Sequence, residues 1–246
     1  MRTLEYSDPS TLEESFVAGS PDLSVVMPAF NEQATIREAV GKVLDLPFVA
    51  ELLVIDDGSA DQTVERLLEV SDPRLRVIRH PVNRGKGAAV RTGMAAASAP
   101  FLAIQDADLE YSPADLERLL IPLRDGRADV VYGSRFISGN ERRVLYFWHS
   151  MGNKFLTNLS NMFTNLNLSD METGYKLFTR EVARGVTLVE DRFGFEPEFT
   201  AKIARARYRV YEVGISYSGR TYAEGKKITW RDGVRALYCI IKYSRG

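Results

Sequence analysis

Short apolar segments alternate with longer segments of helical periodicity over roughly the first half of the chain. Each apolar segment is short enough for a buried strand, and in each longer segment apolar residues recur every three or four positions. The predicted strands span residues 23–28, 51–56, 75–79, 101–105 and 129–132. Helices are expected to begin near Asn31, Asp61, Lys86 and Pro113. Strands that alternate with helices in this way favour an α/β fold, with a mostly parallel central sheet flanked by helices.

Beyond residue 140 the pattern changes to a long apolar stripe at helical spacing. The stripe consists of Trp148, Met151, Phe155, Leu159, Met162 and Leu166. We expect it to pack against the core, which is the more common role of such a stripe, although the aromatic residues 146–148 also suit a lipid interface. Further strands are predicted over 175–178 and 208–217, and further helices over 197–205 and 230–241.

The composition is that of an ordinary soluble globular protein, with 246 residues of which 45% are hydrophobic and 26% are charged. A formal net charge of -1 and the lack of a basic tail argue against nucleic-acid binding. The single cysteine, Cys239, excludes an internal disulfide and a cluster of thiolate metal ligands.

No segment has the roughly eighteen consecutive apolar residues of a membrane span. Residues 1–20 are polar and lack the apolar core of a secretory signal. We therefore expect a cytoplasmic protein that contacts a membrane only peripherally, from its cytoplasmic face.

The strand at 101–105 ends in three carboxylates spaced two apart, Asp106, Asp108 and Glu110. Open α/β sheets bind their ligands at the carboxyl ends of strands. Carboxylate oxygens there suit Mg²⁺ or Mn²⁺ that arrives with a diphosphate. The alternative for so short a pattern is a solvated acidic turn before the helix at Pro113.

Polar residues also follow the ends of other predicted strands, in the loops at 28–32, 56–59 and 133–135. Asn31 is most simply a helix cap. Asp57 could cap the following turn or accept hydrogen bonds from a nucleobase or ribose. Four such loops in one chain describe a site better than four unrelated turns do.

The segment Asn83-Arg-Gly-Lys-Gly87 opens a helix with two glycines, like a dinucleotide fingerprint. Val90 occupies its third glycine position, and His80 stands where a Walker A loop needs glycine, so neither motif is present. Lys86 and Arg84 could instead lie near a donor phosphate. Two histidines in all exclude a histidine-rich metal site.

In order and spacing, these motifs resemble the family-two GT-A glycosyltransferases, and within them the polyprenyl-phosphate (dolichol-phosphate) hexosyltransferases. The resemblance rests on residues 28–32, 54–59, 83–87, 106–108, 133–135, 170–178 and 220–226. It implies a GT-A nucleotide-diphospho-sugar transferase fold. We expect a catalytic domain over 21–228, preceded by a polar lead-in over 1–20 and followed by an amphipathic C-terminal helix over 229–246.

The resemblance also implies roles for individual residues. The nucleoside pocket would be lined by Pro28, Phe30, Glu32, Ile55 and Asp57. The ribose and diphosphate would meet Asp106, Ala107 and Asp108. Asp108 and Glu110 would hold the metal, Mn²⁺ or Mg²⁺, although the family often has another residue where Glu110 stands. The donor diphosphate or acceptor phosphate would be held by Arg135, Arg220 and Lys226, for which surface salt bridges are the alternative.

The implied activity is inverting transfer of a hexose from a nucleotide sugar to a polyprenyl phosphate. The segment 83–91 favours UDP-glucose or a related UDP-sugar over GDP-mannose. Many relatives append transmembrane helices, and here the amphipathic stretches 145–166 and 230–243 would attach the protein to a membrane surface. The alternatives are a transferase with a glycan or small-metabolite acceptor, a non-catalytic nucleotide-sugar-binding module, and a nucleotidyltransferase.

Overall fold

The computed structural model of the protein describes residues 21–137, 143–144, 146–219 and 230–244, without the side chains of residues 230–232. The lead-in predicted over 1–20 and the predicted site residues Arg220 and Lys226 lie outside these ranges.

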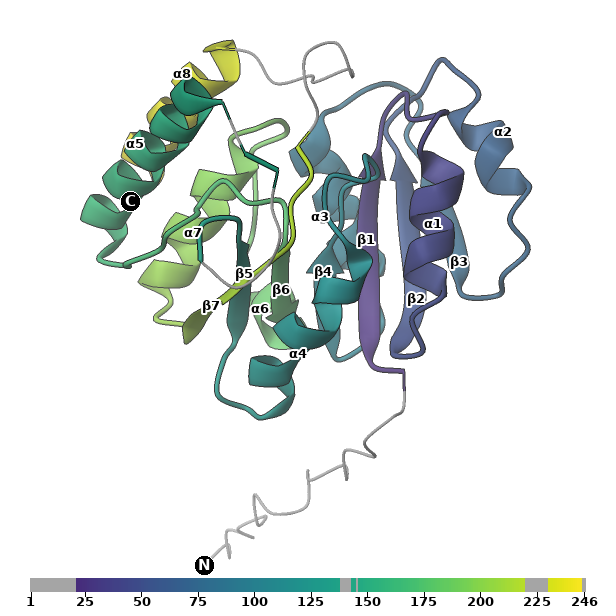
Figure 1. Ribbon diagram of the computed structural model, residues 1–246, viewed down its shortest axis with the longest axis horizontal. Helices are drawn as coiled ribbons and strands as arrows, with labels where there is room; N and C mark the ends of the chain where they lie inside the picture. Colours follow the sequence, from purple (N-terminus) through teal and green to yellow (C-terminus); the bar gives the residue numbers. More distant parts are fainter. Residues whose placement is uncertain (1–20, 138–142, 145, 220–229, 245–246) are drawn as a thin grey trace, which may run out of the picture.

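Strands and helices alternate along the described chain as the hydrophobic pattern predicts (Figure 1). The strands are β1 (Leu23–Ala29), β2 (Val49–Asp56), β3 (Leu75–Arg79), β4 (Phe101–Ile104), β5 (Val130–Ser134), β6 (Lys176–Thr179) and β7 (Val210–Gly214). The helices are α1 (Ile36–Leu44), α2 (Thr63–Leu68), α3 (Lys86–Ala96), the 3-10 turn η2 (Pro113–Asp115), α4 (Leu116–Arg124), α5 (Phe147–Thr164), α6 (Arg180–Gly185), α7 (Phe195–Arg205) and α8 (Trp230–Ser244).

The strands form one sheet of seven, in the order β3-β2-β1-β4-β6-β5-β7. Strands β1 to β4 are parallel, β5 is parallel to β7, and β6 is antiparallel to both of its neighbours, β4 and β5. The chain order reverses between β1 and β4, which creates a topological switch point. In sheets of this kind, ligands bind in the crevice at the carboxyl ends of the strands flanking that point. The fold therefore places the candidate site at the ends of β1 and β4.

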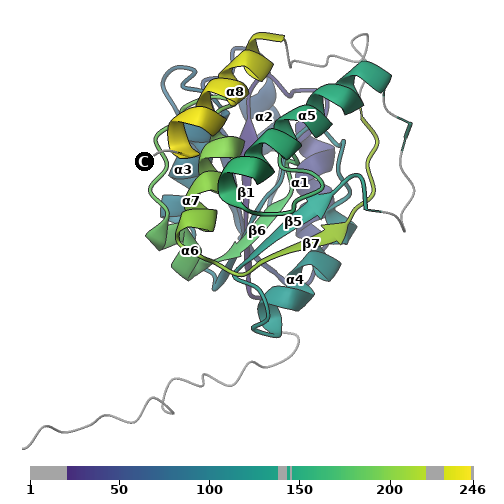
Figure 2. The ribbon, with the colours of Figure 1, turned by 90° about the vertical axis from the view of Figure 1, so that its left-hand side faces the viewer.

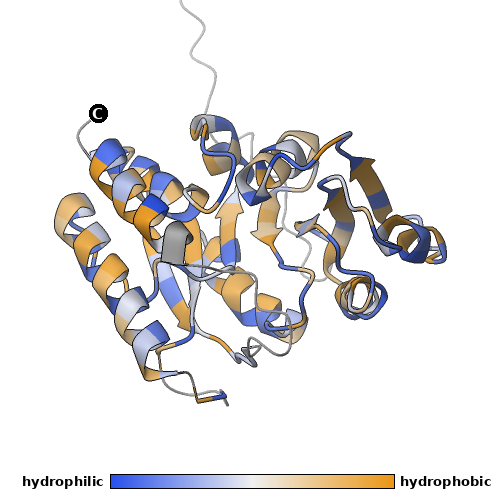
Figure 3. Cartoon of the chain, turned by 90° about the horizontal axis from the view of Figure 1, so that it is seen from above, coloured by the Kyte–Doolittle hydropathy of each residue, from blue (hydrophilic) through white to orange (hydrophobic). Residues whose placement is uncertain are grey.

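Alternate residues of the central strands face two different hydrophobic cores, because side chains of a strand point to opposite faces in turn. Val25 and Ala103 pack in the cluster that includes α1 and α4. Leu102 and Phe178 pack in the cluster that includes α6 and α7, and Val26 packs against α3. Seen from above, the strands are largely hydrophobic between helices of mixed character (Figure 3). Helices on both faces thus bury the sheet.

Helices α5 and α8 lie side by side over α7 and form an outer layer on one face (Figure 2). The expectation that the apolar stripe of α5 packs in the core is wrong for much of the stripe. Trp148, Phe155 and Met162 are 80%, 60% and 80% exposed. Of the stripe, Leu159 and Leu166 do pack against the core, beside the buried Thr157 and Ser160 of α5. No helix in the described ranges is both long and apolar enough to cross a membrane.

Two local expectations near β1 also differ from the structure. Pro28 does not end the strand, because β1 continues to Ala29 with Pro28 in register with Ile55. Asn31 is not the helix cap, since α1 begins at Ile36 and its N-cap is Thr35. Asn31 adopts a left-handed conformation with φ 53°, which asparagine tolerates better than most residues.

Candidate active site

Hydrogen bonds join the loops that follow β1 and β2. The backbone N–H of Asn31 donates to Ser59 Oγ at 2.9 Å, and Asn31 Oδ1 accepts from the N–H of Ala60 at 2.9 Å. The N–H of Glu32 donates to Thr63 Oγ1 at 2.9 Å. Asn31 therefore connects two loops of the site. This connection, and not a helix cap, is the role that the structure gives to Asn31.

Asp57, at the end of β2, holds the loop before α3. Its Oδ1 accepts a hydrogen bond from the N–H of Arg84 at 3.0 Å, and its Oδ2 accepts one from the N–H of Gly85 at 2.7 Å. Gly85 has φ 102°, and a Cβ there would collide with the backbone of Asp191. Only glycine fits at position 85, because its backbone lies against that of Asp191 with a positive φ.

Lys86, the first residue of α3, reaches the loop that follows β4. This loop, residues 106–110, is called the acidic loop below. Its Nζ lies 2.9 Å from Asp106 Oδ1 and 3.4 Å from Glu196 Oε1. Burial acts to lower the pKa of Lys86, but the charges of Asp106 and Glu196 outweigh it and raise this pKa above the ordinary value. Lys86 therefore stays cationic between two acids, one on the acidic loop and one on α7.

The acidic loop turns sharply between its second and third carboxylates. Leu109 has φ 62°, and the N–H of Glu110 donates to Asp108 Oδ1 at 3.1 Å. Glu110 Oε2 accepts a hydrogen bond from the hydroxyl of Tyr217 at 2.8 Å. Ala107 is buried. The turn keeps Asp108 and Glu110 next to each other at the edge of the sheet.

The described residues contain no group of three or more histidine, cysteine or acidic side chains that could hold a metal ion. Mg²⁺ that arrives with a diphosphate needs only one or two protein carboxylates, because phosphate oxygens and water complete its coordination. Asp108 and Glu110 offer two carboxylates of the required hard-oxygen type. The donor set thus fits a cation shared with the substrate and does not fit a protein-only cage.

Arg135, which follows β5, is fixed by the buried Asp170. Its Nε and Nη2 donate to the two oxygens of Asp170, each at 2.7 Å. Burial acts to raise the pKa of Asp170, but the charge and hydrogen bonds of Arg135 lower it below the ordinary value. Asn153 of α5 also donates to Asp170 at 3.0 Å, and the Arg135 guanidinium lies over the ring of Tyr217. Arg135 is therefore an oriented cation and not a surface salt bridge.

Two stacked tyrosine rings pack next to the acidic loop. The rings of Tyr111 and Tyr175 stack with centroids 4.8 Å apart, and the Tyr175 hydroxyl donates to Gln105. The N–H of Gly174 donates to the Tyr111 hydroxyl at 3.0 Å. A Cβ at Gly174 would collide with Asp106 and with the Tyr111 ring. Gly174 is thus needed for the close approach of this segment to Asp106.

Three ionisable residues near this site had no role assigned from the sequence: the buried Lys176 and Glu196, and the partly buried Glu172. Burial lowers the pKa of Lys176 to about 8, and burial together with Glu196 raises the pKa of Glu172 to about 8. Glu172 Oε1 and Glu196 Oε2 are buried and have no hydrogen-bond partner in the described part of the chain. Such perturbed groups cluster at functional sites.

The sequence offered only a weak signal for these three residues. Glu172 and Lys176 lie in the segment 170–178, which carried the resemblance but no individual role. Glu196 reads as an ordinary acid in the first turn of α7. Glu196 and Lys86 are far apart in the sequence, so the sequence alone does not show that they contact each other.

The residues predicted for the nucleoside pocket lie at the ends of β1 and β2. Phe30 is 37% exposed, whereas Ile55 is fully buried against Val26 and Ala89. The Glu32 carboxylate accepts a hydrogen bond from Thr35 at 3.0 Å. The structure thus brings Pro28, Phe30, Glu32 and Asp57 to one edge and leaves Ile55 beneath them.

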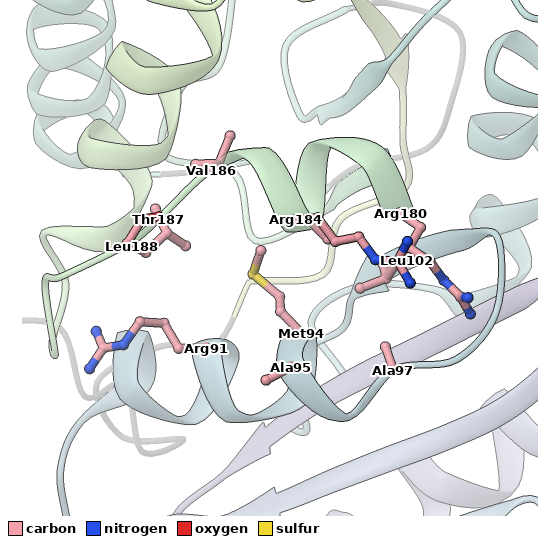
Figure 4. A pocket seen from close by; sticks show the side chains of 11 residues that line it. Arg91, Met94, Ala95, Ala97, Leu102, Arg180, Arg184, Val186, Thr187 and Leu188 are labelled. Carbon is pink, nitrogen blue, oxygen red and sulfur yellow. The ribbon is translucent and has the colours of Figure 1, made fainter.

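A separate cavity of about 370 Å³ lies between α3 and α6 (Figure 4). Its lining includes Arg91, Met94, Arg180 and Arg184. Residue 179, just before α6, pairs with the first residue of β4, so this cavity lies toward the opposite edge of the sheet from the acidic loop. It is not part of the candidate site.

The comparisons with known proteins agree with this architecture. Residues 24–187 match the model of the family described as Glycosyl transferase family 2. This match covers more than half of the chain, so the chain belongs to glycosyl transferase family 2. The class predicted from the motifs, a glycosyltransferase, is confirmed.

Two relatives illustrate the likeness. Glycosyltransferase AglJ of Haloferax volcanii is 30% identical over 203 residues, which are 82% of this chain and 65% of that protein. A dolichol-phosphate mannosyltransferase of Pyrococcus furiosus is 26% identical over 230 residues, which are 90% of this chain and 64% of that protein. The chain thus spans slightly less than two thirds of the length of either relative.

A solved structure shows the same fold. The glucosyl-3-phosphoglycerate synthase of Mycobacterium tuberculosis, crystallised with Mn²⁺, uridine diphosphate and phosphoglyceric acid, superposes with a TM-score of 0.70 at 21% identity. The match covers 92% of this chain and 79% of that one. The predicted GT-A fold is confirmed.

Proposed function

We propose that this chain transfers a hexose from a nucleotide sugar to a polyprenyl phosphate at the cytoplasmic face of a membrane. The observation that carries the proposal is the ion pair of Lys86 with Asp106 at the switch point of the sheet. It places a partly buried cation beside the acidic loop, where the diphosphate of a donor would lie. The names of relatives, among them a dolichol-phosphate mannosyltransferase and an undecaprenyl-phosphate mannosyltransferase, support a lipid phosphate as acceptor.

The donor nucleoside would lie over the ends of β1 and β2. The pocket residues are Pro28, Phe30, Glu32, Ile55 and Asp57, with Ile55 acting as a buried support. Asp106 and Ala107 would meet the ribose and diphosphate, and Lys86 would balance the phosphate charge. UDP-glucose is the favoured donor and GDP-mannose the second. The uridine diphosphate bound to the solved neighbour supports the first choice.

Asp108 and Glu110 would hold Mn²⁺ or Mg²⁺. When bound, such an ion neutralises the charge that develops on the departing diphosphate. Crystals of the solved neighbour with Mn²⁺ in one case and Mg²⁺ in another support this assignment. Asp108 would bind the ion directly, and the hydroxyl of Tyr217 would keep the Glu110 carboxylate in place.

Arg135 would hold the acceptor phosphate in line with the anomeric carbon, together with Arg220 and Lys226, which lie outside the described residues. A phosphate acceptor is already an anion, so its attack needs no strong general base. It does need cations to bring two negative groups together, and a guanidinium suits phosphate geometry. We infer a single in-line displacement with inversion at the anomeric carbon.

The membrane would meet the outer layer of α5 and α8. Aromatic residues of both helices, among them Trp148, Phe155 and Tyr238, are exposed. The basic groups of Arg235 and Lys242, both on α8, lie over the ring of Tyr238. Apolar area together with basic residues is enough for reversible attachment to anionic lipid. The exposed stripe of α5, which the core interpretation leaves unexplained, supports this proposal.

A transfer assay tests the proposal. Purified protein with Mn²⁺ and a short polyprenyl phosphate receives labelled UDP-glucose, UDP-N-acetylglucosamine or GDP-mannose, and the label is counted in the organic extract. We expect a lipid product from one donor. Metal-dependent release of nucleoside diphosphate without a lipid product would overturn the lipid acceptor and favour a small phosphorylated acceptor, such as the phosphoglyceric acid bound to the solved neighbour. Release of pyrophosphate would indicate a nucleotidyltransferase.

A further inference from the structure

His80 lies buried between β2 and α3, directly after β3. It is 5% exposed, and both of its ring nitrogens have partners. Nδ1 lies 2.7 Å from Asp57 Oδ1, and Nε2 lies 2.9 Å from Thr92 Oγ1. No role for His80 followed from the sequence, where it served only to exclude a Walker A loop.

The hydrogen bonds determine where one proton of His80 lies. The Asp57 carboxylate can only accept, so Nδ1 of His80 carries a proton and donates it to Asp57. Nε2 shares a hydrogen bond with the Thr92 hydroxyl, in which either atom can be the donor. His80 is therefore held from both sides of its ring, with Nδ1–H directed at Asp57.

The burial of Asp57 explains why it needs these donors. Asp56 and Asp57 are adjacent and both buried. Arg79 Nε lies 3.1 Å from Asp56 Oδ2 and compensates the first carboxylate. The second carboxylate is stabilised by hydrogen bonds from His80 and from the backbone N–H groups of Arg84 and Gly85, because a buried carboxylate without hydrogen bonds is costly.

The same contacts leave Asp57 with one accepting position. A carboxylate oxygen has two lone pairs. Those of Oδ1 are taken by His80 and by the N–H of Arg84, and one of those of Oδ2 is taken by the N–H of Gly85. Three donors from two directions fix the carboxylate, and one lone pair of Oδ2 remains for a ligand.

We propose that His80 is a positioning residue for the nucleobase: through its Nδ1–H it fixes Asp57 so that Oδ2 accepts the ring N–H of the base. This inference rests on the proposed function. Uracil and guanine present such a ring N–H, whereas the ring nitrogens of cytosine and adenine at this edge are acceptors. The pair therefore selects uridine or guanosine nucleotides and rejects cytidine and adenosine nucleotides.

The test combines nucleotide binding with a spectroscopic measurement. Isothermal titration calorimetry measures the affinity of UDP, GDP, CDP and ADP for the wild type, His80→Leu, His80→Gln and Thr92→Val. We expect UDP or GDP to bind at least about tenfold more tightly than CDP and ADP, the difference expected for one hydrogen bond to a charged group. His80→Leu should weaken the preferred nucleotide about tenfold. In the transfer assay, it should raise KM for the donor and leave kcat nearly unchanged.

The conservative variants separate positioning from packing. Glutamine keeps one N–H donor for Asp57, so His80→Gln should recover part of the lost affinity. Thr92→Val keeps the side-chain shape but removes the hydrogen-bond partner of Nε2, so it should weaken binding less than His80→Leu. Nitrogen-15 NMR of the imidazole rings should show Nδ1 of His80 protonated. The chain has only two histidines, and His149→Gln assigns the signals.

Each result bears on the inference in a defined way. A His80 ring without a proton on Nδ1, or unchanged UDP and GDP affinity in properly folded His80→Leu, would overturn the positioning role and leave the proposed function intact. A wild type that binds none of the four nucleotides would overturn both. If circular dichroism shows that His80→Leu is unfolded, Thr92→Val and the NMR signals decide the question.

Discussion

Arg135 donates two hydrogen bonds of 2.7 Å to Asp170, one to each carboxylate oxygen. The pair joins the end of β5 to the segment before β6, which are 35 residues apart in sequence. A bidentate pair fixes the plane of the guanidinium as well as its position. Arg135 therefore faces the candidate site in one orientation.

Asp170→Asn should destabilise the protein and lower its activity. The substitution keeps the shape of the side chain but leaves Arg135 as a buried cation without its counterion, which we expect to cost about 3 kcal/mol. Urea unfolding measures this cost. In a double-mutant cycle with Arg135→Met, the double variant should be more stable than Asp170→Asn alone. Strictly additive losses would contradict the coupling.

Asp108→Ala should abolish transfer and leave the fold intact. The side chain lies on a partly exposed loop, so we expect the free energy of unfolding to fall by about 1 kcal/mol or less. Electron paramagnetic resonance should show that Mn²⁺ no longer binds in the presence of UDP. Asp125→Ala, which removes an exposed partner of Arg127, is the matched control and should keep full activity. Near-normal turnover of Asp108→Ala would remove the metal assignment.

Gly174→Ala should impair the site more than the fold. The added Cβ would displace the Asp106 carboxylate from Lys86 and press on the Tyr111 ring. We expect a loss of stability of about 1–3 kcal/mol, the usual cost of overpacking, and a loss of activity larger than that. Gly41→Ala is the control, because a Cβ at Gly41 meets nothing within 4 Å. In helix α1 it should stabilise the protein by about 0.5–1 kcal/mol. Equal effects of the two substitutions would contradict the close approach at Gly174.

The docking of α8 should weaken at low pH through Glu190. Burial acts to raise the pKa of Glu190, but hydrogen bonds from Arg235, Tyr243 and Lys242 outweigh it and lower this pKa from 4.5 to about 2. The carboxylate therefore contributes its full stabilisation above about pH 4.5 and loses it as the pH falls toward 2. Hydrogen exchange should show α8 losing protection over this interval.

Glu190→Gln should remove that pH dependence at its source. We expect it to lower the free energy of unfolding by about 2 kcal/mol at neutral pH, because three donors lose a charged partner. Glu69→Gln, which removes an exposed partner of Arg37, is the control and should change stability by less than about 0.5 kcal/mol. Unchanged protection of α8 in Glu190→Gln would show that other contacts dock the helix.

Trp148→Ser combined with Phe155→Ser should reduce binding to anionic vesicles in a flotation assay. Both side chains are mostly exposed, so their removal should leave stability nearly unchanged. Leu68→Ser is the matched control, since Leu68 is 76% exposed on α2, away from α5 and α8. It should float like the wild type. Equal flotation of all three proteins would exclude α5 as the attachment surface.

The sequence by itself determined the order of the strands and of most helices, α6 excepted, and the polar loops at the ends of the strands. These features are local: a buried strand needs a short apolar run, and a loop is recognised by the polar residues that interrupt it. The motifs also identified the family, because several of them recur in a fixed order.

The tertiary structure decided which distant residues meet. Lys86, Asp106 and Glu196 lie far apart in the chain and form one charged group only because α3, β4 and α7 meet at one edge of the sheet. It also decided that β6 runs antiparallel and that Trp148 faces outward. Helical periodicity shows that α5 has an apolar face, but the surface that α7 and α8 offer to α5 determines which of its faces is covered.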